Sequence, residues 1–314
     1  MSTKPAKPER RDTKSEAKGL NDEFDRIYKG LNKAQKKAVD TIEGPVMVIA
    51  GPGTGKTTIL TLRIANILRA TDASPENIIA LTFTESGAYA MRKKLVSIIG
   101  PAGYKVSIST FHGFCNDIIG QYPEKFPRII GSKAVSDIEQ MNMMEGIFQS
   151  LPLDILKPYG DIFHHVKASL SQIKNLKKEN ISVADFVESV KKQKKDLADT
   201  PDLYHEKGAH KGKMKGEYIK LTEKIQKNEE LATVYEAYEK ALAEKRYYDF
   251  EDMIVEVVKA MKADEDFLLM LQESYQYILA DEHQDANNAQ NTILEQLSSF
   301  HDSPNQIGRA SCRE

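Results

Sequence analysis

The stretch Val46-Met47-Val48-Ile49-Ala50-Gly51-Pro52-Gly53-Thr54-Gly55-Lys56-Thr57 decides the fold. Its first five residues form a continuous apolar run rich in β-branched side chains, which is typical of a short strand covered on both faces. From Ala50 onward it fits the P-loop pattern, except that Ala50 stands where the pattern has glycine. A helix is expected from about Lys56 to Ala70. A strand, a glycine-rich turn and a helix in this order predict a phosphate-binding loop rather than a plain connecting turn.

Each residue type in this loop has a physical task. Glycines let consecutive backbone N–H groups turn inward around phosphates, in a concavity that a Cβ would obstruct. The helix that begins near Lys56 directs the positive end of its dipole at the same anion. We expect Lys56 to neutralise the β and γ phosphates of ATP and the Thr57 hydroxyl to be a ligand of Mg²⁺. The candidate phosphate-binding residues are Ala50, Gly51, Pro52, Gly53, Thr54, Gly55, Lys56 and Thr57.

Further strands and helices follow the loop at regular spacing. We expect buried strands at 78–83, 106–110 and 275–280, and helices at 32–42 (with Asn32 as N-cap) and 88–99. Strands that alternate with helices indicate βαβ units on a parallel sheet. The fold class is therefore predicted to be α/β.

A carboxylate pair ends the last of these strands. A P-loop requires an acid at the end of another buried strand to hold the Mg²⁺ water shell. Asp281 is the candidate for this role, and Glu282 is placed to act as general base on the attacking water. Gln284 could sense the γ-phosphate. A solvated turn would be the default interpretation of Asp-Glu alone, but its pairing with the P-loop favours function.

Composition sets broader limits. The 314 residues give a prior of about two domains, and 40% hydrophobic residues suffice for a core. No run approaches a membrane span, and two cysteines cannot build a disulfide framework or a four-ligand zinc site. We therefore expect a reducing, cytoplasmic setting. The net charge of −2 hides an asymmetry: Lys174–Lys215 holds 11 Lys against 7 acidic residues, and Glu229–Asp285 holds 16 acidic against 5 basic residues.

With these motifs placed, the chain resembles the amino-terminal part of a UvrD/Rep-type superfamily 1 DNA helicase. Leu31 to Val39 resembles the Q motif, 79–84 motif Ia, 108–115 motif Ib and 281–285 motif II; a further acidic signature is matched by Tyr248 to Met253. The resemblance implies a P-loop RecA-like ATPase domain, interrupted by a helical insertion that grips DNA. It also implies movement along single-stranded DNA in the 3′→5′ direction and action on single-strand/duplex junctions.

The resemblance carries roles onto particular residues. Gln35 would read the adenine edge, and Thr58 would lie beside the nucleotide, where many relatives have an arginine. The positions carried over as DNA contacts are Phe83, Thr84, Thr110, Phe111 and His112. In motif II, His283 replaces the usual tyrosine. The lysine runs 177–178 and 191–195 are either solvated helix faces or phosphate contacts.

The expected organisation follows. Residues 1–20 form a flexible leader, 21–120 the first part of the RecA-like domain, 121–246 the helical insertion, and 247–305 the returning segment with motif II. Residues 306–314 contain neither an apolar strand nor the Gly-Asp that the family has next, so we expect a non-native tail.

On this interpretation the second RecA-like domain, which supplies arginines to the γ-phosphate, is missing. We therefore expect the chain to bind Mg-ATP and DNA weakly, with little hydrolysis and no unwinding. Two alternatives stay open: the helicase part of an AddA/RecB-like helicase–nuclease, and a non-catalytic ATP-binding module that interacts with DNA.

Overall fold

The computed structural model describes residues 23–51, 53–201, 203–204, 212–299 and 306–310. The expected leader at 1–20, Pro52 of the loop and the last four residues lie outside this part of the chain. Among the described residues, no helix is both long enough and apolar enough to cross a membrane. The chain divides into two compact units, which are described separately below.

The first unit contains a parallel five-stranded sheet. Its strands are β1 (Val46–Ile49), β2 (Ile78–Thr82), β3 (Ser107–Thr110), β6 (Tyr277–Ala280) and β7 (Gln306–Ala310), in the order β1-β7-β6-β2-β3. All four neighbouring pairs run parallel. The predicted α/β class with a parallel sheet is thus confirmed, and four of the five strands lie where the sequence indicated.

The fifth strand corrects an expectation. The segment expected to contain no strand forms β7 between β1 and β6, with Ile307 opposite both Val46 and Leu279. Because a parallel ladder is made by backbone N–H and C=O groups, a segment with little apolar character can still complete it. The apolar run that we sought is not required at this position.

The strands differ in how they are covered. Every residue of β2 and β6 is buried, as expected for strands inside an α/β sheet. β1 instead lies at an edge of the sheet, and Met47 and Ile49 are each 63% exposed. The expectation that β1 is covered on both faces is therefore wrong.

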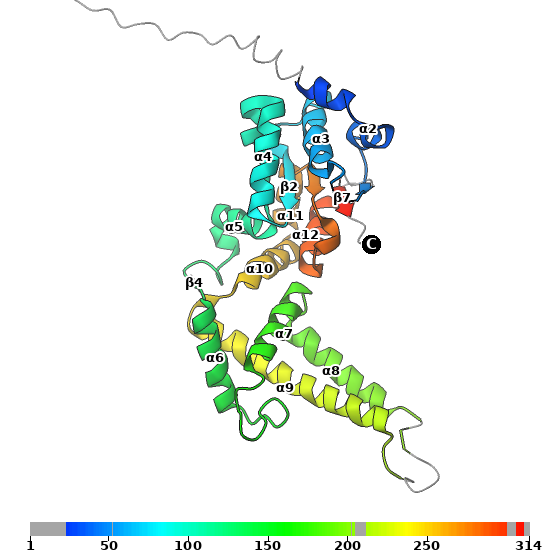
Figure 1. Cartoon of the computed structure of the whole chain (residues 1–314). Helices are drawn as coiled ribbons and strands as arrows, with labels where there is room; N and C mark the ends of the chain where they lie inside the picture. Colours follow the sequence, from blue (N-terminus) through cyan, green and yellow to red (C-terminus); the bar gives the residue numbers. More distant parts are fainter. Residues whose placement is uncertain (1–22, 52, 202, 205–211, 300–305, 311–314) are drawn as a thin grey trace, which may run out of the picture. The chain divides into compact units, whose positions relative to one another are not determined.

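Helices of the first unit pack onto the sheet through apolar side chains. Among them are α2 (Lys33–Asp40), α3 (Lys56–Ala70) and α4 (Glu85–Ile99). The unit also contains α11 (Glu265–Ser274), and α5 (Phe111–Gln121) and α12 (Asn288–Ser298) cross the division between units. Figure 1 shows α3 and α4 side by side next to β2. Leu60 and Ile64 of α3, Met91 of α4, and Ile78 and Leu279 of the strands belong to one buried cluster.

A buried arginine fixes α2 against α3. Arg63, 1% exposed, donates from Nη1 to the carbonyl of Ala38 at 2.8 Å and from Nη2 to that of Ile42 at 3.0 Å. Burial lowers the pKa of Arg63 to about 10, and the carboxylate of Glu43 partly offsets this. These bonds satisfy carbonyls at the end of α2, so the two helices hold a defined register.

The second unit is mainly helical. It comprises α6 (Asp137–Ser150), α7 (Val166–Lys178), α8 (Val183–Ala198), α9 (Gly216–Glu244) and most of α10 (Phe250–Ala263), with a two-residue pairing of β4 (Lys133–Ala134) and β5 (Tyr247–Tyr248). Figure 1 shows α8 alongside the long helix α9. Met144, Phe148, Ile173, Val234 and Tyr238 lie in its core.

The second compact unit is longer than the insertion expected from the sequence, whose bounds stay a prediction. The second unit spans 115–260 and includes 287–292, whereas we expected 121–246. The physical reason for the later boundary is that the start of α10 is held by buried ion pairs: Asp249 and Asp252 bind Lys177 of α7. Charge pairing between distant segments leaves no local signal in the sequence.

Candidate nucleotide and nucleic-acid site

The glycine loop joins β1 to α3 and has the backbone that its sequence predicts. Gly53 has φ +74° and Gly55 has φ +76°, a left-handed conformation that side chains rarely adopt. A Cβ at Gly53 would meet no atom within 4 Å, so that side of the loop faces open space. The Thr54 hydroxyl donates to the carbonyl of Gly51 at 2.8 Å, which tightens the turn.

Lys56 is the first residue of α3 and is 6% exposed. It makes no hydrogen bond or ion pair with the described residues, and no acidic residue lies in the first turn of α3. The N-cap residue is Gly55, which has no side chain that could accept hydrogen bonds from the first N–H groups of α3. A cation without a partner, at an open helix N-terminus, favours an anion in the loop. These residues fit the phosphates of a nucleotide.

Gln35 reaches this loop from α2. Its Nε2 donates to the carbonyl of Thr54 at 3.1 Å, and its Oε1 accepts from the N–H of Asn32 at 2.9 Å in a capping box. The structure therefore brings the Q-motif glutamine against the phosphate loop. The second Nε2 hydrogen and second Oε1 lone pair of Gln35 stay available for an adenine edge.

Thr58 has a neighbour that the sequence did not reveal. Lys94 of α4 donates a hydrogen bond from Nζ to the Thr58 Oγ1. Burial lowers the pKa of Lys94. Lys94, 36 residues away in the sequence, thus places a basic group beside Thr58, where many relatives have an arginine.

The acidic pair lies at the carboxyl end of β6. Asp281 is 8% exposed; its N–H donates to the carbonyl of Leu81 at 2.8 Å, and its Oδ1 accepts from the N–H of Glu282 at 2.8 Å. Because all five strands are parallel, Asp281 and the loop after β1 both lie at the carboxyl ends of the strands. One strand, β7, separates them, which corresponds to about 10 Å between strand axes.

Glu282 adopts an unusual backbone. It has φ +53° and ψ +38°, a left-handed conformation for a residue with a side chain. Gln284 Nε2 donates to Glu282 Oε2 at 2.6 Å and to Asp285 at 3.0 Å. Strain of this kind costs about 1–3 kcal/mol and concentrates at functional sites. The hydrogen bond from Gln284 thus fixes the position of the Glu282 carboxylate. His283, between these two residues, is half-buried.

The residues expected to contact DNA differ in exposure. Phe83 is 42% exposed and directly follows β2, while Thr84 is exposed and caps α4 through a hydrogen bond from the N–H of Gly87. Phe111 is 2% exposed, so of the two rings Phe83 alone offers a face for stacking. His112, next to it at the start of α5, is half-buried.

Thr110 is already engaged inside the protein. It is 8% exposed, and its hydroxyl donates to Glu85 Oε1 at 2.8 Å. Glu85 and Ser86 stand where the family often has Asn-Lys after motif Ia. The Glu85 carboxylate therefore joins the segment after motif Ia to motif Ib, a link that spacing alone could not predict.

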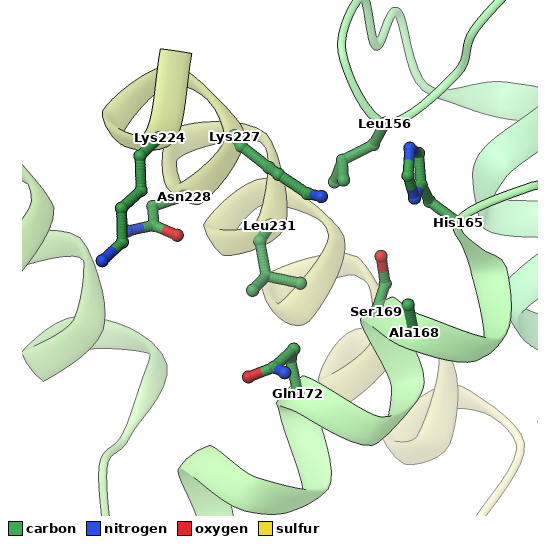
Figure 2. A pocket seen from close by; sticks show the side chains of 9 residues that line it. All are labelled: Leu156, His165, Ala168, Ser169, Gln172, Lys224, Lys227, Asn228 and Leu231. Carbon is green, nitrogen blue, oxygen red and sulfur yellow. The ribbon is translucent and has the colours of Figure 1, made fainter. Parts of the chain in front are cut away.

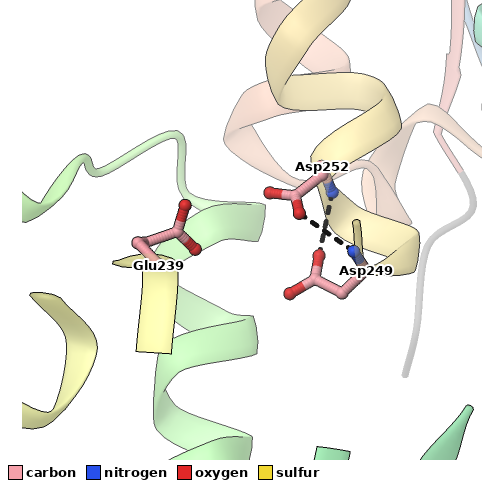
Figure 3. A group of neighbouring side chains, drawn as sticks. All are labelled: Glu239, Asp249 and Asp252. Atoms are coloured by element: carbon pink, nitrogen blue, oxygen red, sulfur yellow. Dashed lines mark hydrogen bonds between the residues drawn. The ribbon is translucent and has the colours of Figure 1, made fainter. Parts of the chain in front are cut away.

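The acidic signature at 248–253 proves to be an ion-pair centre. Figure 3 shows the carboxylates of Glu239, Asp249 and Asp252 converging, with reciprocal hydrogen bonds between the last two. Lys177 Nζ lies 2.6 Å from Glu239, 2.6 Å from Asp249 and 2.8 Å from Asp252. Arg128 pairs with Glu239 at 2.7 Å and with Glu256 at 2.9 Å.

This arrangement corrects one interpretation of the lysine runs. Lys177 is 2% exposed and bound to carboxylates, so it is not a phosphate contact. The run at 191–195 is exposed, and Lys194 pairs with Glu229 at 2.7 Å.

Comparison with known proteins decides the family. A family model described as UvrD/REP helicase N-terminal domain matches residues 31–308. The chain belongs to this family. The match includes Gln35, the glycine loop, the acidic pair at 281–282 and the first three residues of β7.

The curated relatives of the chain include helicases. The chain is similar to the ATP-dependent DNA helicase PcrA of Bacillus subtilis (strain 168), with 29% identity over 272 residues. PcrA of Staphylococcus aureus (strain Mu50) is 29% identical over 269 residues, and PcrA of Staphylococcus epidermidis is 26% identical over 272. The alignments cover 86–87% of this chain but only 32% of each relative, so the chain spans about a third of their length.

Proposed function

We propose that this chain is the ATP-binding part of a DNA helicase that translocates 3′→5′ on single-stranded DNA and unwinds junctions. The observation that carries the proposal is Lys56, a lysine 6% exposed that pairs with no described residue, at the N-terminus of α3 after two left-handed glycines. This geometry supports the binding of a polyphosphate. Family membership and the PcrA relatives support ATP as the nucleotide.

The residues at the carboxyl ends of the strands would have separate roles in ATP binding and hydrolysis. Lys56 and the N–H groups of α3 would bind the β and γ phosphates. Thr57 and Asp281 would hold Mg²⁺, which supplies charge neutralisation between the phosphates. Glu282 would accept the proton of the attacking water, and the hydrogen bond from Gln284 would keep its carboxylate in position.

The proposed DNA contacts lie in the same unit. Phe83 would stack on a base without sequence preference, because every base offers a π-face. Thr84 and His112 would bind phosphates and fix the register of the strand. Thr110 and Phe111 would position these residues from within rather than touch DNA, since both are buried.

We further propose that the 314-residue chain binds ATP and single-stranded DNA but turns over slowly and does not unwind. It aligns with a third of each relative, and arginines that complete phosphoryl-transfer sites can contribute 10³- to 10⁵-fold in rate. A malachite-green assay with and without single-stranded DNA tests this. We expect turnover near background; robust DNA-stimulated turnover that Lys56→Ala abolishes would contradict the inactivity.

A further inference from the structure

A pocket of about 310 Å³ lies in the helical unit between α7 and α9. Its polar lining includes His165, Ser169 and Gln172 from the α7 side, and Lys224, Lys227 and Asn228 from α9. Leu156 and Leu231 supply apolar surface. The volume is at the lower end of the range for small-molecule sites, roughly 300–1,000 Å³. A single nucleotide or a ligand of similar size would suit it.

The pocket is positively charged. Lys224 and Lys227 make no hydrogen bond or ion pair with any residue that the structure describes, and no carboxylate lines the pocket. The acidic residues that follow on α9 are engaged elsewhere. Glu229 binds Lys194, and Glu230 accepts from the N–H groups of residues 154–156 at 2.8–3.1 Å. The two ammonium groups therefore have their charge available for an external anion.

The hydroxyl of Ser169 points to the same ligand. Ser169 is 3% exposed, yet its side chain makes no hydrogen bond with a described residue. Figure 2 shows its Oγ directed into the space between the helices, with the Lys227 side chain extending into the same space. A ligand atom in this space could form the hydrogen bond that the Ser169 hydroxyl lacks among the described residues. His165, the N-cap of α7, makes no side-chain cap, while the N–H of Val166 donates to the carbonyl of Phe163 at 3.1 Å.

We propose that this pocket binds the phosphate group of a nucleotide-sized phosphate ester. Lys227, Ser169 and the N-terminus of α7 would contact the phosphate, and Leu231 and Leu156 would pack against the apolar part of the ligand. The amides of Gln172 and Asn228 offer donors and acceptors for a base edge. The ligand is either a free nucleotide or one nucleotide unit of a single strand, which share this chemistry. The proposal does not depend on the ATP site, because it concerns the other unit.

An NMR titration with thymidine 5′-monophosphate tests the proposal. The full chain carries Lys56→Ala, which removes the contribution of the glycine loop. In this background we expect Lys227→Gln to weaken binding roughly fivefold or more, because a charge-assisted bond is lost. Ser169→Ala should weaken it roughly twofold to tenfold. Lys240→Gln, an exposed lysine on the same helix, should leave it unchanged. Thermal unfolding of each variant confirms that it is folded.

Three ligands separate the outcomes. Inorganic phosphate should compete with thymidine 5′-monophosphate, and thymidine should not bind measurably. Equal binding of thymidine and its monophosphate, or equal loss in the Lys227 and Lys240 variants, would overturn the proposal. A thymidine octanucleotide identifies the source of the ligand: displacement of the monophosphate indicates a unit within a strand, and its persistence indicates a free nucleotide.

Discussion

Gln35 Nε2 lies 3.1 Å from the carbonyl oxygen of Thr54, and this hydrogen bond ties α2 to the glycine loop. The bond spans 19 residues and connects the Q motif to the loop that precedes α3. Because Gln35 Oε1 also accepts from Asn32, the amide is held in one orientation. A nucleotide base that bonds to this amide would therefore be linked to the glycine loop through the Gln35–Thr54 hydrogen bond.

The first prediction concerns Gln35→Ala. The variant loses a side chain that we propose reads adenine, and a neutral hydrogen bond contributes about 0.5–1.5 kcal/mol. We expect ATP to bind roughly threefold to tenfold more weakly and the preference for ATP over CTP to decrease, measured by calorimetry with both nucleotides. Gln193→Ala, an exposed glutamine of α8, serves as control. An unchanged preference would exclude base reading by Gln35.

The second prediction concerns the glycines. Gly55→Ala places a Cβ on a residue with φ +76°, and the left-handed conformation costs about 1–2 kcal/mol. Urea unfolding should show this loss. Gly146→Ala is the matched control, because Gly146 lies exposed within α6, where alanine should stabilise by about 1 kcal/mol. Destabilisation of similar size in both variants would argue against the strained loop.

The third prediction concerns the ion-pair centre. Lys177→Met removes a cation that is 2% exposed and leaves buried carboxylates without their partner. Breaking such a pair costs about 3–5 kcal/mol, which should appear in the urea unfolding of the helical unit. Lys174→Met is the control, since Lys174 lies 3.9 Å from the exposed Asp137. A loss below about 1 kcal/mol for Lys177→Met would show that the centre is not a stabilising element.

The fourth prediction concerns acid. The Ser136 backbone N–H and hydroxyl, with the Tyr247 hydroxyl, lower the pKa of Glu139 from 4.5 to about 2. Because the folded state has the lower pKa, this carboxylate stabilises the protein above about pH 4.5, and the contribution is lost as pH falls toward 2. Glu139→Gln keeps a capping side chain but cannot titrate. Urea midpoints between pH 6 and pH 3 should therefore fall less steeply for the variant; parallel curves would contradict this role.

The sequence predicts those features whose signal is local. β2 and β6 are nearly continuous apolar runs. The glycines of the loop have left-handed backbone conformations, which glycine adopts readily because it lacks a Cβ. β7 has no such signal, because its place depends on backbone pairing with β1 and β6. Lys94 beside Thr58, Glu85 beside Thr110 and Lys177 among its carboxylates are pairings across 25 to 75 residues. Residue spacing contains no information about them.

The most direct measurement is nucleotide affinity at the glycine loop. Fluorescence titration of the chain with a labelled ATP analogue and Mg²⁺ should show saturable binding at one site. Lys56→Ala should weaken that binding at least tenfold, equivalent to about 1.4 kcal/mol, while Lys93→Ala on the exposed face of α4 should not change it. No saturable binding by the wild-type chain, or equal affinity of the wild type and Lys56→Ala, would contradict an ATP site at this loop.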